Sequence, residues 1–178
     1  TSSYIYQLER QIISILLKYG AEEILFEDTR LSKDENGKVL ETKKEIRSKV
    51  FEKIYLDLQQ DEIEFTHSPF KDIYNKLING FHNGTTLSIE NFINDLDSSS
   101  SKIVSDILIN DEKYQLHDWE RKNIYVKKIG SELSQLVNET ILNMRRFLID
   151  KKIIELQEFQ KEDNKNDILE QVMSYYKL

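Results

Sequence analysis

The sequence predicts an all-α protein, and three observations lead to that expectation. Only one proline and five glycines occur in 178 residues, which is too few for many strands and tight turns. Apolar residues recur at steps of three and four in several segments, as in helices with one buried face. A long stretch from Glu132 to about Lys161 contains neither Gly nor Pro. We expect a helical bundle over residues 1–130, then a long helix and a C-terminal helical hairpin over residues 131–178.

The first helix is predicted from Tyr4 to Tyr19, with Gly20 as its stop signal. A second helical period spans residues 46–58. The dipeptide Ser68-Pro69 predicts a third helix start, because Ser caps free N–H groups and Pro sits where no N–H is needed. The apolar stripes of these helices are Ile5, Leu8, Ile12, Ile15, Leu16 and Tyr19; Ile46, Val50, Phe51, Ile54, Tyr55 and Leu58; and Phe70, Ile73, Tyr74, Leu77 and Phe81.

Residues 21–44 have no helical period. Apolar residues 24–26 and 39–40 flank a charged stretch that contains Asn36-Gly37, and Asn-Gly is a hairpin turn signal. Both a short hairpin and a loop therefore remain open here. Two short helices follow, around residues 89–93 and 103–108, and Trp119 then lies in a polar stretch where it fits either a core contact or an interface anchor.

Gly130-Ser131 precedes the predicted long helix, whose ~30 residues would extend about 45 Å. That length exceeds the stretch of helix that a domain of this size can pack against, so part of the helix should project from the domain. Asn164 to Asp167 is read as a polar break, and a last amphipathic helix follows it. Its apolar face consists of Ile168, Leu169, Val172, Met173 and Tyr176.

The composition excludes several functions. The 25 basic residues are outnumbered by 32 acidic ones, giving a net charge of −7, so a sequence-independent grip on nucleic acid is not expected. Cysteine is absent, which excludes disulfides, thiolate catalysis and cysteine zinc sites. No stretch approaches the ~18 apolar residues that span a bilayer. The start at Thr1, without Met, indicates a fragment of a longer protein, and the expected compartment is the cytoplasm.

We find no catalytic signature. Neither a Gly-rich phosphate loop nor a zinc-binding His pair occurs, and His67, His82 and His117 lie far apart. Surface or capping roles suit these histidines better than ligand roles. Asp95 and Asp97 could hold magnesium, but a solvated helix end is the simpler interpretation.

Two charged segments have similar alternatives. The acidic segment 61–64 reads as a solvated loop rather than a metal cluster. The basic pairs 145–146 and 151–152 are interspersed with Asp150 and Glu155, so a solvated helix face is favoured over phosphate binding. We therefore predict no catalytic residues, no metal site and no cofactor.

The predicted last helix is the candidate partner surface. Two helices cannot bury all their apolar residues on each other, so the remainder suggests a helix that docks in a groove of a partner. Nearby charges, Lys165 and Glu170 among them, would set orientation and association rate more than affinity. The predicted partner-binding residues are Ile168, Leu169, Val172, Met173, Tyr176, Lys165 and Glu170.

Four stretches carry a resemblance to a known family. They are Tyr6–Gly20; Asp61–Phe65 leading into Pro69–Tyr74; Phe92–Asn94 followed by Tyr114–Glu120 and Ile124–Val126; and Leu133–Lys152, which contains Arg145-Arg146-Phe147. In order and spacing the chain resembles the C-terminal helicase-binding domain of bacterial DnaG-type DNA primases, in the Bacteroidetes form.

The resemblance implies an all-helical, non-catalytic module with a bundle and a docking hairpin. Its partner would be the N-terminal domain of the ring-shaped replicative helicase (DnaB-type), in the primosome at the replication fork. The parent primase makes RNA primers on single-stranded DNA, and its zinc and magnesium would belong to other domains. No direct contact with nucleic acid or membrane is expected.

Two alternatives remain. The chain could be the self-associating N-terminal domain of the replicative helicase itself. It could also be a small helical enzyme or ligand-binding protein, which would need a pocket with convergent polar groups.

Overall fold

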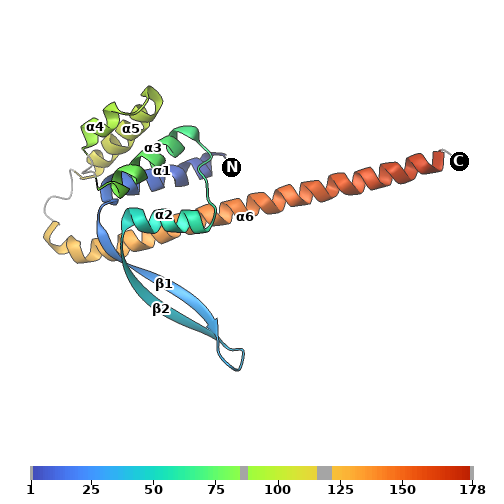
Figure 1. The fold of residues 1–178 in the computed structure, drawn as a ribbon, viewed down its shortest axis with the longest axis horizontal. Helices are drawn as coiled ribbons and strands as arrows, with labels where there is room; N and C mark the ends of the chain where they lie inside the picture. The colour runs from blue at the N-terminus through green and yellow to red at the C-terminus, as the bar shows by residue number, and fades with distance from the viewer. Residues whose placement is uncertain (1, 85–87, 116–121, 177–178) are drawn as a thin grey trace.

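The protein is mostly helical, as predicted, but it is not all-α. The computed structural model describes the backbone of residues 2–84, 88–115 and 122–176, and the side chains of residues 4–27, 32–84, 88–110 and 130–161. In Figure 1, α1 to α5 gather around one half of α6, while the hairpin and the other half of α6 project. The elements are α1 (Ser2–Tyr19), β1 (Glu23–Lys33), β2 (Val39–Lys49), α2 (Val50–Gln60), α3 (Ser68–His82), α4 (Ile89–Asn94), α5 (Ser98–Gln115) and α6 (Lys122–Tyr176).

Helix α1 is the centre of the core and contacts α2, α3 and α6. Its apolar residues are buried on several sides, which explains why it has more of them than a one-face helix needs. It ends at Tyr19, and Gly20 follows as predicted. A Cβ at Gly20 would clash with the ring of Phe81 from α3. The buried residues of α1 include Ile5, Leu8, Ile12, Ile13, Ile15, Leu16 and Leu17.

The all-α prediction is wrong for residues 23–49, which form an antiparallel hairpin. Of the two alternatives left open for this segment, the hairpin is present: Gly37 has a φ of 78°, and its N–H donates to the carbonyl of Asp34 at 2.9 Å. The Asp34 side chain also accepts from the N–H groups of Asn36 (2.9 Å) and Lys38 (2.8 Å). A local turn that needs a left-handed residue therefore starts the hairpin, and Phe26, fully buried, anchors it to the core.

Helix α3 begins where Ser68-Pro69 predicted, with Pro69 in the first turn. The residue at the N-cap is His67 and not Ser68, and its side chain forms no cap hydrogen bond. The prediction of Ser68 as the cap is therefore wrong by one residue. Helices α4 and α5 pack on each other, and α5 also contacts α3.

Helix α6 continues through Asn164 to Asp167 without a break. The predicted C-terminal helical hairpin is therefore wrong, and the chain has one 55-residue helix instead. Polar residues such as Asn and Asp cost at most ~0.7 kcal/mol each in a helix. None of them removes a backbone donor as Pro does, so polarity alone does not end the helix.

The predicted division between residues 1–130 and 131–178 falls inside α6, which begins at Lys122. The part of α6 after Gly130 contributes to the core through Leu133, Val137, Ile141 and Met144. At 1.5 Å per residue, α6 is about 80 Å long. None of the helices in the described segments is long and apolar enough to cross a membrane.

Candidate protein-binding surface on α6

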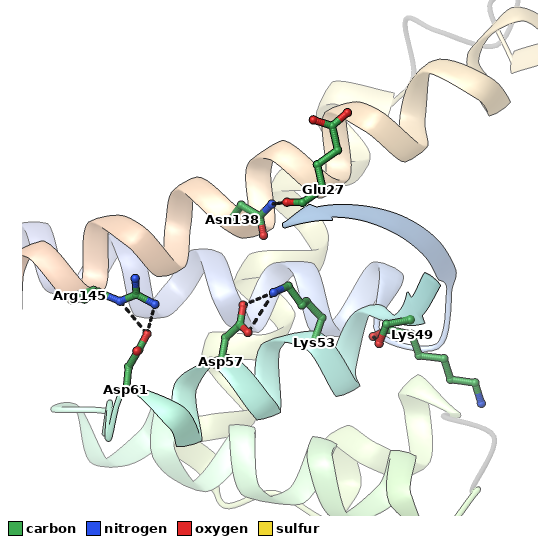
Figure 2. A network of polar contacts seen from close by, with 8 residues as sticks. Glu27, Lys49, Lys53, Asp57, Asp61, Asn138 and Arg145 are labelled. Carbon is green, nitrogen blue, oxygen red and sulfur yellow. Dashed lines mark hydrogen bonds and ion pairs between the residues drawn. The ribbon is translucent and has the colours of Figure 1, made fainter. Parts of the chain in front are cut away.

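An ion pair marks the point where α6 leaves the core. The guanidinium of Arg145 donates from Nε (2.7 Å) and Nη2 to one carboxylate oxygen of Asp61. Figure 2 shows this pair, which joins α6 to the end of α2. One residue earlier, Met144 is fully buried, whereas every described side chain from Ile149 to Lys161 is exposed.

The loop that holds Asp61 has a well-defined backbone. The N–H of Glu62 donates to the carbonyl of Gln59 (3.2 Å), and the N–H of Ile63 donates to that of Leu58 (2.9 Å). These two bonds form a Schellman motif, in which the residue after the cap is left-handed. Glu62 accordingly has a φ of 53°. The predicted solvated acidic loop is thus an ordered helix end that carries the partner of Arg145.

A buried carboxylate fixes the other end of this loop. Glu9 of α1 is fully buried, and its Oε1 accepts from the N–H (2.5 Å) and hydroxyl (2.8 Å) of Thr66. Its Oε2 accepts from the N–H (3.2 Å) and the ring Nδ1 (2.6 Å) of His67. Four hydrogen-bond partners therefore surround one buried carboxyl group, as burial of a polar group requires. Sequence analysis missed Glu9, although its position between Leu8 and Ile12 on a buried face was a usable signal.

Beyond Met144, apolar side chains face solvent on α6. Exposed hydrophobic residues this close together on one helix are typical of an interaction surface. They extend from residue 149 to residue 159, about three helical turns, and the half of α6 beyond the core projects (Figure 1). They are Ile149 (51% exposed), Ile153 (47%), Ile154 (54%), Leu156 (55%) and Phe159 (68%).

The predicted partner-binding residues all belong to this same projecting helix. They were expected on a separate last helix, which does not exist. Their side chains lie outside the described residues, so the structure does not place them against one another. The positions are Ile168, Leu169, Val172, Met173, Tyr176, Lys165 and Glu170.

The predicted basic cluster of α6 borders a shallow cleft of about 450 Å³ between α6 and residues 61–63. Arg145 is held by Asp61, and Lys152 lies 3.7 Å from Glu155. Acidic side chains therefore neutralise part of the basic cluster. This arrangement is compatible with the interpretation of the cluster as a solvated helix face.

A larger groove of about 1000 Å³ separates the hairpin from α6. Its walls carry Glu23, Glu27, Glu45 and Glu139, while Arg47 lies 3.8 Å from Glu23. Figure 2 shows the amide of Asn138, which donates to the backbone carbonyl of Glu27 at 3.4 Å and so links the two sides. No sequence motif indicated this groove, because it depends on the placement of the hairpin.

Asp97 is a helix cap, in agreement with the simpler interpretation of the Asp95–Asp97 pair. It accepts from the N–H of Ser100 (3.0 Å), the hydroxyl of Ser100 (2.7 Å) and the N–H of Ser99 (2.8 Å). These hydrogen bonds, from the backbone and side chain of Ser100 above all, hold the pKa of Asp97 below its usual range. In the described segments, no three His, Cys, Asp or Glu side chains are grouped as a metal site would require.

Other titratable groups have structural surroundings. The ring of His82 packs edge-on against Phe51 and Tyr55, and burial raises the pKa of Tyr74, with a smaller contribution from Tyr55. His117 and Trp119 lie outside the described residues. His67 and His82, for which surface or capping roles were expected, thus have aromatic or carboxylate neighbours.

The comparison with family models matches the whole chain. The match covers residues 1–178 and carries the description "Domain of unknown function (DUF8430)". The chain belongs to the DUF8430 family. No curated protein and no solved structure matches it. The family description assigns no activity, so the function has to be argued from the α6 surface and from the resemblance already described.

Proposed function

We propose that this DUF8430 domain docks a DnaG-type replicative primase on the N-terminal domain of the DnaB-type helicase, in the bacterial cytoplasm. In this role the domain itself is non-catalytic and needs no cofactor. The observation that supports docking is the row of exposed apolar side chains on α6 beyond Met144. The identity of the partner comes from the family resemblance of the four stretches described above.

A projecting helix of this kind needs a partner for physical reasons. Helices in water gain most of their stability from packing an amphipathic face, and the described side chains of the projecting half are all exposed. A groove on the helicase could receive this helix, with apolar side chains as anchors and charges as guides. We assign the anchors to Ile168, Leu169, Val172, Met173 and Tyr176, and the guiding charges to Lys165 and Glu170.

The test is calorimetric titration of the chain into the replicative helicase of the same organism. Met173→Ala combined with Tyr176→Ala is expected to weaken binding by about 2–4 kcal/mol, the magnitude typical of interface hot spots. A version that ends after Gln160 should not bind measurably. Both changes lie far from Met144, the last fully buried residue among the described side chains of α6, so the thermal unfolding of the core should be unaffected.

The outcomes separate the possibilities. Unchanged affinity in the folded double variant would move the contact from the end of α6 to the helical core. No binding by the intact chain would refute the proposal. If that chain instead closed into a ring by itself, it would fit the alternative that it is the N-terminal domain of the helicase.

A further inference from the structure

A second surface on α6 has the spacing of a coiled-coil seam. Leu142, Ile149 and Leu156 are seven residues apart, and Ile153 lies between the last two. In heptad terms the first three occupy d positions and Ile153 an a position, with Arg146 and Gln160 at the neighbouring a positions. All four apolar side chains are about half exposed: Leu142 (48%), Ile149 (51%), Ile153 (47%) and Leu156 (55%).

This seam faces away from the core. The buried residues Val137, Ile141 and Met144 lie on another side of α6, about 120° around the helix at 100° per residue. The hairpin approaches the seam side at Asn138, whose amide donates to the carbonyl of Glu27. From Leu142 onward, the apolar side chains of the seam remain about half exposed.

The charge distribution of α6 indicates what covers the seam. Residues 145–152 contain four basic residues and one acidic residue, a net charge of +3. Residues 155–170 contain six acidic residues and two basic ones, a net charge of −4. A helix with this polarity is complementary to a second copy that runs in the opposite direction.

We propose that two copies of this chain pair as an antiparallel coiled coil through the seam. Ile153 of each copy packs against Leu156 of the other, and Ile149 packs against Gln160. Arg146 then lies beside the acidic half of the other helix. A parallel pair would place Arg146 against its own counterpart at a core position, where like charges repel.

The pairing seam uses part of the exposed apolar row of α6, whereas the proposed helicase anchors, residues 168–176, lie further along the helix. The pairing requires only the chain itself, so it does not depend on the helicase proposal. The seam has a matched control because Ile153 and Ile154 are adjacent, of the same type and similarly exposed (47% and 54%). They point about 100° apart, and only Ile153 is in the seam.

Sedimentation equilibrium of the chain without helicase tests the association. The wild-type chain should be a dimer that dissociates on dilution. Ile153→Glu is expected to raise the dimer dissociation constant at least ~100-fold, because two carboxylates enter an apolar contact. The matched variant Ile154→Glu should leave the constant within a few-fold. A wild-type monomer at every concentration, or equal effects of the two variants, would overturn the proposal.

Cross-linking tests the direction, and the absence of cysteine from the chain makes each introduced thiol unique. A mixture of the Ile149→Cys and Gln160→Cys variants should form a disulfide-linked pair under mild oxidation, since the two positions face each other. Ile149→Cys alone should remain largely uncross-linked, because its own counterpart is several turns away. Efficient self-cross-linking of Ile149→Cys would indicate a parallel pair and refute the antiparallel arrangement.

Discussion

The buried carboxylate of Glu9 should be the most sensitive polar position for stability. It accepts four hydrogen bonds from Thr66 and His67 and is fully buried. Glu9→Ala leaves the donors of both residues without their acceptor, and removing one partner of such a buried group costs about 3–5 kcal/mol. For a chain of this length that loss lowers the melting temperature by roughly 10 °C, measurable by circular dichroism at 222 nm.

Glu9→Gln is the matched control, since it keeps the shape and one oxygen. That oxygen can still accept from Thr66, whereas the new NH₂ group meets the N–H and the ring Nδ1–H of His67. We expect an intermediate loss of about 1–3 kcal/mol. Urea denaturation of both variants gives the free energies of unfolding. A loss below about 1 kcal/mol for Glu9→Ala would refute the view that this carboxylate holds the 61–67 loop on α1.

Two further changes test the ends of α2 and α5. Glu62→Gly is expected to raise the free energy of unfolding by about 0.5 kcal/mol, because relief of the left-handed strain outweighs the extra freedom of Gly in the unfolded chain. Glu62→Val should lower the free energy of unfolding instead, and urea denaturation measures both variants. A Glu62→Val variant more stable than Glu62→Gly would contradict the Schellman motif. Asp97 has a lowered pKa in the folded protein, so its ionised side chain stabilises the fold at neutral pH. This contribution begins to be lost below about pH 4, the ordinary pKa of Asp, and is lost fully once the pH falls through the lowered pKa of the folded protein. Asp97→Asn should flatten this pH dependence in thermal unfolding between pH 7 and 3, and parallel curves would contradict it.

Local signals in the sequence predicted much of the fold. Gly20 ends α1, Pro69 lies in the first turn of α3, and Asn36-Gly37 forms the turn of the hairpin. Each of these depends on the backbone preference of one or two residues. On α6, the buried residues Leu133, Val137, Ile141 and Met144 follow the helical period, which alone determines which residues share a face.

The errors arose where distant parts of the chain decide the structure. The strands 23–33 and 39–49 pair along their full length, and the pairing outweighs the shortage of Gly and Pro that predicted an all-α protein. The cap of α3 was misplaced because Glu9, some 58 residues earlier, binds the N–H of His67. The supposed break at Asn164 reflected polarity, which lowers helix propensity but does not remove a backbone hydrogen bond.

The far half of α6 gives the two proposals a common physical basis. From Ile149 onward its described side chains are exposed, so further stabilisation of this half has to come from a second chain. A partner that binds only the ordered helix stabilises it in proportion to the logarithm of its concentration. The seam spans residues 142–156 and the proposed helicase anchors span residues 168–176, so a second copy and the helicase would use different stretches of one helix.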